Sequence, residues 1–125
     1  MRKKTNNPLS VSKGQMEASI SNAIIAFEKD YMGRGPEDIK THILHDVVLI
    51  RLKGVLTPAE CQLAKDAEGV RLIKEVRTKL IENAKDFLEK IIKDHTGITP
   101  ASLHTDISTK TGERIIIFSL EEALP

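Results

Sequence analysis

The chain repeats one layout, a long helix followed by a two-stranded hairpin, and this repetition constrains its fold more than any other feature. In the first copy, apolar residues recur at three- and four-residue steps from Met16 to Tyr31, which indicates a helix with one buried face. A period of two then begins in EDIKTHIL and VVLIRLKG, which are separated only by His45 and Asp46. A second helical region and two further alternating segments, SLHTDIS and ERIIIFSL, complete the second copy.

Capping signals set the limits of the helices. Ser12 and Gln15 form a capping box at the start of the first helix, and Gly33 is expected to end it. The segment TPAE predicts another helix start, and we expect that helix to run to about Glu68, where Gly69 marks a break. A longer helix should then end at Gly97, with one apolar side formed by Ile73, Val76, Leu80, Ala84, Phe87, Leu88 and Ile91.

These elements predict a two-layer α+β fold, in which long helices cover one face of a four-stranded, mostly antiparallel sheet built from two α-β-β pseudo-repeats. We expect a basic disordered tail at residues 1–11 and a single domain over 12–125. The first hairpin should turn Ile39, Thr41, Ile43, Val48, Ile50 and Leu52 toward the helices. A three-residue turn at 110–112 would do the same for Leu103, Thr105, Ile107, Ile115 and Ile117.

The opposite face of the predicted sheet mixes aliphatic and charged side chains, whereas a fully solvated face would be more uniformly polar. We therefore expect a second copy of the chain or a partner protein to cover it, although the long helical region could instead fold across it. The candidate contact residues on this face are His42, Leu49, Arg51, His104, Asp106, Arg114, Ile116 and Phe118.

Composition narrows the classes of function. The net charge of +1 and the four aromatic residues argue against nucleic-acid binding. Cys61 is the only cysteine, and the four histidines lack paired-ligand spacing, so neither a disulfide, a metal nor another cofactor is expected. No apolar run could insert in a membrane, and the first residues lack the apolar region of a signal peptide, so we expect a cytoplasmic protein.

Two groups of polar residues are candidate sites. His104 and Asp106 share one side of a strand and could form part of a general base, but no nucleophile accompanies them, so a salt-linked pair on a non-enzymatic protein is favoured. Arg34, held between two glycines in GRGP, could join His104 and Lys110 in recognising bicarbonate or phosphate. This small-anion sensor is the alternative to a binding protein.

The strings GRGP, VVLIRLKGVLTPAE and HTDISTKTGERIIIFSL, in this order, resemble the MpsC-like family of small bacterial proteins. That family is named for the third component of a Na+-translocating membrane-potential-generating system. The resemblance implies an accessory protein that works with a membrane subunit and a large subunit linked to inorganic-carbon uptake. It implies a complex with those subunits, held at the inner face of the membrane through a partner, and it supplies no catalytic residues. The homodimer is expected from the mixed sheet face and not from the resemblance.

Overall fold

The computed structural model describes residues 11–125, in which the elements follow the repeated layout. The expected disordered tail therefore lies outside the described residues, apart from Val11. The first copy comprises α1 (Lys13–Phe27), the π-helical turn η2 (Glu28–Met32), β1 (Asp38–Leu44) and β2 (Val47–Lys53). The second comprises α2 (Pro58–Leu63), α3 (Ala67–Asn83), α4 (Lys85–Thr96), β3 (Pro100–Ser108) and β4 (Glu113–Leu120).

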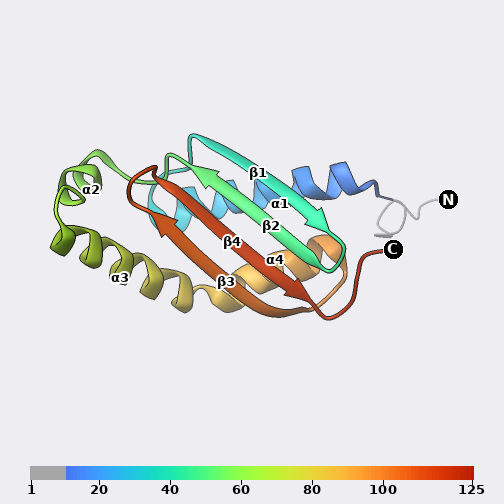
Figure 1. Cartoon of the computed structure of the whole chain (residues 1–125). Helices are drawn as coiled ribbons and strands as arrows, with labels where there is room; N and C mark the ends of the chain where they lie inside the picture. Colours follow the sequence, from blue (N-terminus) through green and yellow to red (C-terminus); the bar gives the residue numbers. More distant parts are fainter. Residues whose placement is uncertain (1–10) are drawn as a thin grey trace.

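The four strands form one antiparallel sheet in the order β1-β2-β4-β3. The second strands of the two hairpins, β2 and β4, are therefore neighbours at its centre. Figure 1 shows α1 and α4 behind the sheet, while α2 and the first half of α3 reach beyond its end. No helix of residues 11–125 crosses the front face, which we call the open face. The predicted two-layer α+β fold is confirmed.

The hydrophobic core lies between the sheet and the helices. Its fully buried members include Ile20 and Ile24 of α1, Leu88 of α4, Ile50 of β2 and Ile116 of β4. Burying a side chain of this size contributes roughly 1.5–3 kcal/mol, so this layer supplies the main stabilising force.

The predicted capping signals act as expected. The backbone N–H of Gln15 donates to the hydroxyl of Ser12, and the Gln15 side chain accepts from the N–H of Ser12. Thr57 and Glu60 form the same reciprocal pair at the start of α2. The helical segments end at Gly33 and Gly97 with φ angles of 95° and 77°, which glycine adopts at little cost.

The long helical region breaks at places that differ from the prediction. Helix α2 ends at Leu63 and not near Glu68. Asp66 caps α3 by accepting from the N–H of Gly69 at 2.7 Å. Gly69 therefore lies in the first turn of α3 and not at a break. A Cβ at this position would stand 1.6 Å from the carbonyl oxygen of Leu63, so glycine is required by the close approach of the two helices. A second break, which the sequence pattern did not reveal, follows at Ala84.

The expected apolar stripe of this region is also partly wrong. Ile73, Ala84, Leu88 and Ile91 are buried as predicted, but Val76 and Phe87 are 57% and 56% exposed. Arg77 and Ile81 occupy the buried side of α3 instead.

The strand β4 is turned over relative to the prediction. Ser108 pairs with Glu113, so the turn spans residues 109–112 and not 110–112. Gly112 closes it at φ 75°, donating its N–H to the Ser108 carbonyl at 2.8 Å. A shift of one residue moves each side chain to the other face. The predicted inward orientation of Ile115 and Ile117 and the outward orientation of Arg114, Ile116 and Phe118 are therefore both wrong.

Candidate functional site

Three rows of side chains run across all four strands of the open face, because directly paired residues of neighbouring strands point the same way. Beyond them, Asp38 pairs with Lys53 and Ser108 pairs with Glu113 on the same face. The middle row runs from His42 on β1 through Leu49 and Ile117 to His104 on β3. The row nearer the β3–β4 turn consists of Lys40, Arg51, Ile115 and Asp106. The third row consists of Leu44, Val47, Ser119 and Ser102.

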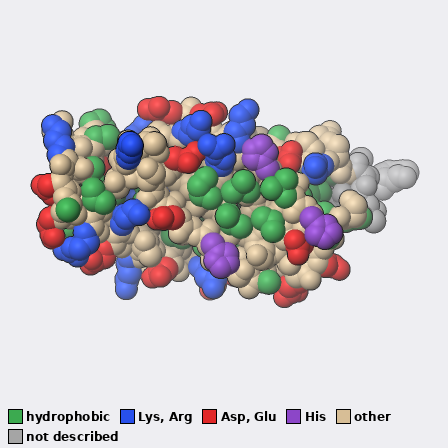
Figure 2. All heavy atoms as spheres, in the orientation of Figure 1, with side chains coloured by type: hydrophobic (Ala, Val, Ile, Leu, Met, Phe, Trp, Pro, Cys, Tyr) green, Lys and Arg blue, Asp and Glu red, His purple; other side chains and the backbone are tan. Residues whose placement is uncertain are grey.

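The centre of the open face is apolar. Val47 and Leu49 of β2 and Ile115 and Ile117 of β4 are each half-buried, and no helix of the described chain covers them. Figure 2 shows a hydrophobic patch over the middle of the sheet, with histidine and charged side chains around it. An apolar centre with a polar rim is the usual composition of a protein–protein interface.

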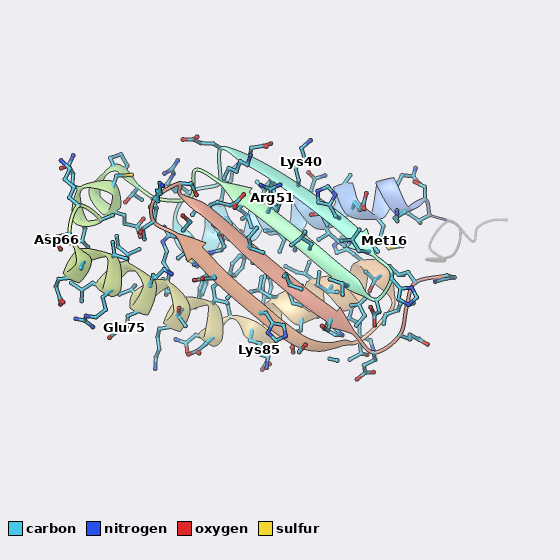
Figure 3. The ribbon with its side chains drawn as sticks, in the orientation of Figure 1. Met16, Lys40, Arg51, Asp66, Glu75 and Lys85 are labelled. Atoms are coloured by element: carbon cyan, nitrogen blue, oxygen red, sulfur yellow. The ribbon has the colours of Figure 1, made fainter. Side chains whose placement is uncertain are left out.

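Basic side chains of the open face lie mainly over β1 and β2 and acidic ones over β4 and β3, with Asp38 at the start of β1 as an exception. Lys40 and Arg51 lie next to each other over β1 and β2 (Figure 3), and Glu113 and Asp106 stand on β4 and β3. Arg51 forms an ion pair with Glu113 at 2.7 Å between Nη2 and Oε2. Both side chains remain partly exposed, so this pair contributes at most about 1 kcal/mol to folding.

The histidine and aspartate that share one side of β3 are not linked to each other. The Oγ of Ser102 lies 3.2 Å from Nε2 of His104. Asp106 instead accepts from the backbone N–H of Ile107 at 2.8 Å and pairs with Lys74 of α3 at 3.3 Å. The Ile107 N–H, helped by Lys74, lowers the pKa of Asp106. The expected salt-linked pair is therefore replaced by separate contacts.

The structure divides the candidate contact residues into two groups. His42, Leu49, Arg51, His104 and Asp106 lie on the open face as predicted. Arg114, Ile116 and Phe118 point into the helix layer and are at most 1% exposed, so a partner on the open face cannot reach them. Ile115 and Ile117 take their places, and only the length of the turn could have revealed this exchange.

The three residues of the anion hypothesis are not brought together by any hydrogen bond or ion pair within residues 11–125. Arg34 donates from Nη1 to the Leu56 carbonyl at 2.7 Å, which fixes the loop after η2 to the end of the first hairpin. Lys110 is exposed in the β3–β4 turn, and His104 stands in the middle of β3.

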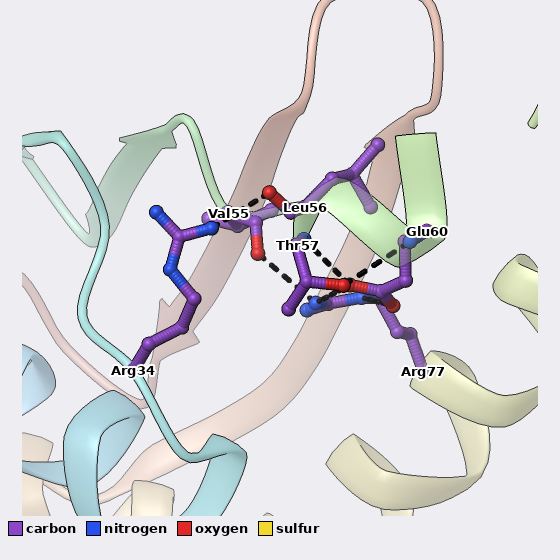
Figure 4. A network of polar contacts seen from close by, with 6 residues as sticks. All are labelled: Arg34, Val55, Leu56, Thr57, Glu60 and Arg77. Carbon is purple, nitrogen blue, oxygen red and sulfur yellow. Dashed lines mark hydrogen bonds and ion pairs between the residues drawn. The ribbon is translucent and has the colours of Figure 1, made fainter. Parts of the chain in front are cut away.

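A second polar network joins α2 and α3 to the sheet (Figure 4). Arg77 of α3 donates from Nη2 to Glu60 Oε1 at 2.7 Å and to the Val55 carbonyl at 3.0 Å, and from Nε to Glu60 Oε2 at 2.8 Å. Burial alone would raise the pKa of Glu60, but hydrogen bonds from Arg77 and Thr57 outweigh it and lower that pKa. The sequence pattern gave no signal for Arg77 because it lies on an apolar helix side.

Two further charged residues are buried between the sheet and the helices. Glu28 of η2 and Arg114 of β4 are each 1% exposed, and Arg114 donates from Nη1 to the Thr105 hydroxyl at 2.9 Å. Burial raises the pKa of Glu28 despite the nearby Arg114 and Arg77. Burial lowers the pKa of Arg114 to about 10, so this guanidinium stays charged at neutral pH.

No cluster of three or more histidine, cysteine, aspartate or glutamate side chains within residues 11–125 could hold a metal ion. Over the same residues, each helix is too short or too polar to cross a membrane. The open face and its rim are therefore the candidate functional site.

Sequence comparison places a small α+β protein of this kind in a known class. Residues 12–122 match the family described as Na+-translocating membrane potential-generating system (MpsC), and the chain belongs to this family. It is 46% identical over 109 residues to a protein of Bacillus subtilis (strain 168) named "Uncharacterized protein YbcI", a match that covers 87% of this chain and 88% of the relative. No solved structure matches the chain.

Proposed function

We propose that this chain is a non-enzymatic accessory component of a Na+-translocating membrane-potential-generating system, and that two copies bind each other through their open faces. The observation that carries the proposal is the apolar centre formed by Val47, Leu49, Ile115 and Ile117, which the described helices leave uncovered. Membership of the MpsC family supports the link to such a system. The proposal places the dimer on the cytoplasmic side, held at the membrane by a partner subunit.

The order of residues across the sheet selects one arrangement of the two copies. A two-fold axis parallel to the strands places β1 over the partner's β3 and β2 over its β4. Lys40 then faces Asp106 of the second copy, and Leu49 faces its Ile117. Opposite charges meet at both edges, and apolar side chains meet at the centre, as a self-complementary interface requires.

A two-fold axis across the strands gives a poorer match. It would place the charged row of Lys40 and Arg51 over the row of Leu44 and Val47. Lys40 and Arg51 would then both face apolar side chains, which is unfavourable, whereas the axis along the strands places only Arg51 opposite an apolar residue, Ile115. The charge distribution therefore favours the axis along the strands.

The size of the open face sets the expected strength of the contact. Four strands about 4.8 Å apart and about seven residues long span roughly 19 Å by 23 Å. The resulting area of roughly 400 Å² is about half of the usual 800 Å² that each partner buries in a stable complex. We therefore expect a dimer that dissociates at micromolar concentrations.

Sedimentation velocity over a micromolar concentration series tests this proposal. The wild-type chain should self-associate. Leu49→Asp and Ile117→Asp should each abolish association through the open face, because both put a charge at its apolar centre. Ala18→Asp, an exposed site on α1, is the matched control and should not change association. Circular dichroism should show that every variant retains its fold.

Charge exchange at the edges tests the orientation. Lys40→Asp alone should weaken the dimer because it faces Asp106 of the second copy, whereas the double variant Lys40→Asp, Asp106→Lys should restore it. If Ile117→Asp leaves the association unchanged, the open face is not the self-interface. Unchanged association of both charge variants would refute the axis along the strands.

A further inference from the structure

Helix α3 carries two ridges of apolar side chains, of which only one is buried. Ile73 and Ile81 belong to the buried ridge together with Arg77. A second ridge, at steps of four residues, consists of Leu72, Val76 and Leu80. Leu72 is 38% exposed and Val76 is 57% exposed, so this ridge faces solvent in the described chain.

Aromatic side chains extend the second ridge at its C-terminal end. The hydroxyl of Tyr31 donates to the Leu80 carbonyl at 3.2 Å, and its ring stacks on Phe27 at 5.0 Å between centroids. Phe27 in turn stacks on Phe87 at 5.9 Å. Tyr31 and Phe87 are both exposed, at 42% and 56%. We call the surface made by Leu72, Val76, Leu80, Tyr31 and Phe87 the helical patch.

The helical patch is separate from the open face. Tyr31 and Phe27 belong to the α1–η2 segment, which lies behind the sheet in Figure 1. A partner on the helical patch would therefore leave the open face free. The exposed apolar side chains of the patch are joined by contacts between α3, η2, α1 and α4 and are not scattered singly, which is typical of a binding surface.

The charges beside the ridge change sign around its centre. Beside the ridge, α3 carries the exposed Glu68, Arg71 and Glu75 before Val76 and the exposed Lys79 and Glu82 after it, and Lys85 follows at the start of α4. The signs are negative, positive, negative, and then positive, negative, positive. Figure 3 shows Glu75 in the middle of α3 and Lys85 beyond its inner end.

This sign pattern makes the helix complementary to a reversed copy of itself. In an antiparallel pair centred on Val76, Leu72 lies against Leu80 of the second copy. The same registration puts Glu75 beside Lys79 of that copy and Arg71 beside its Glu82. A two-fold parallel pair would instead bring this charged side of the helix against the opposite side of the second copy, so these ion pairs would not form.

We propose that a second copy of this chain docks on the helical patch, with its α3 antiparallel to α3 and a two-fold axis at Val76. Side chains at steps of four residues form the ridges that interdigitate in the commonest type of helix packing, with helix axes about 8–10 Å apart. The contact is isologous, and the ion pairs between Glu75 and Lys79 occur twice in it.

This contact goes beyond the proposed open-face dimer and is independent of it. A chain with two isologous surfaces on different sides of the molecule assembles beyond a dimer, into a closed tetramer or an open chain of copies. Loss of one surface should leave dimers made through the other. The two proposals can therefore fail separately.

Site-specific cross-linking is the direct test. In a Cys61→Ser background, Val76→Cys places two thiols at the proposed axis, and mild oxidation should give a disulfide-linked dimer. Lys90→Cys, on an exposed part of α4, is the matched control and should stay monomeric under the same treatment. Absence of a linked dimer from Val76→Cys would overturn the antiparallel pairing.

Sedimentation of charge and ridge variants completes the test. Val76→Asp should reduce the limiting mass to that of the open-face dimer, and Val76→Asp combined with Ile117→Asp should give a monomer. Glu75→Lys should have the effect of Val76→Asp, because it faces Lys79, and Glu75→Lys with Lys79→Glu should restore the wild-type mass. If Val76→Asp leaves the mass unchanged, the helical patch binds no second copy, whatever the open face does. A monomer from Ile117→Asp alone would also contradict the patch contact.

Discussion

Glu28 is a carboxylate with almost no access to water, and its two charged neighbours are arginines. The burial that raises its pKa above 4.5 is a larger influence than the attraction of Arg114 and Arg77. A carboxyl group whose pKa is higher in the folded than in the unfolded protein holds its proton more tightly when folded. Keeping Glu28 ionised therefore costs stability at neutral pH, and this cost disappears as the pH falls below 4.5.

The substitution Glu28→Gln tests whether the ionised carboxylate of Glu28 destabilises the folded protein. The amide keeps the shape without the charge, so the variant should be more stable than wild type at pH values well above the folded pKa, and the difference should vanish in acid. Urea unfolding across the pH range measures it, with the exposed Glu121→Gln as a control that should change stability by less than about 0.5 kcal/mol. A less stable variant at neutral pH would mean that the attraction between Glu28 and Arg114 dominates.

Strand β4 was predicted as the correct type of element, but with the wrong side chains facing the helices. Its alternation and length follow from ERIIIFSL, but every residue in it except Ser119 is apolar or long enough for either face. The turn length alone decides which set faces the helices, and Thr109 adds the residue that reverses the prediction.

Neighbouring residues of β4 should therefore respond differently to the same substitution. Phe118→Asp puts a charge into the core, where loss of the ring alone costs about 3–5 kcal/mol, and should abolish cooperative unfolding. Ile117→Asp, on the half-buried open face, should keep a cooperative transition near that of wild type. Thermal unfolding followed by circular dichroism distinguishes the two, and equal effects would contradict the register of β4.

Sequence patterns predicted the elements better than the site. Capping residues, the His45–Asp46 turn and the glycines at 33 and 97 act through neighbouring residues, so local chemistry sufficed. The break before Asp66 and the burial of Arg77 depend on contacts with residues distant in sequence. The candidate site was half predicted, because β1, β2 and β3 were oriented correctly and β4 was not.

At the scale of the molecule, the chain consists of a sheet with its helix layer and an arm formed by α2 and the first half of α3. Figure 1 shows that the arm reaches beyond the end of the sheet, and none of the residues of α2 is buried. The Arg77 network connects the arm to Val55 at the end of the first hairpin. Apart from the buried Ile73, the arm is therefore held mainly by polar contacts, whereas β2 and β4 are held by the core.

This division predicts that Arg77→Met loosens the arm and leaves the sheet intact. The substitution removes a buried guanidinium from Glu60 and the Val55 carbonyl, and breaking a buried pair costs about 3 kcal/mol. Amide hydrogen exchange should accelerate in residues 58–76 and stay slow in β2 and β4. Lys90→Met, which removes only an exposed ion pair on α4, should leave both regions unchanged.

The same variant should also respond differently to acid. The hydrogen bonds that lower the pKa of Glu60 stabilise the fold above pH 4.5, and this contribution is lost as the pH falls through the lowered pKa of the folded protein. Arg77→Met lacks those bonds, so protonation of Glu60 should destabilise the variant less, and the difference in stability from wild type should narrow in acid.

In the hydrogen-exchange experiment, equal acceleration in the arm and in β4 would mean that the protein unfolds as one unit, in which case the arm has no separate stability.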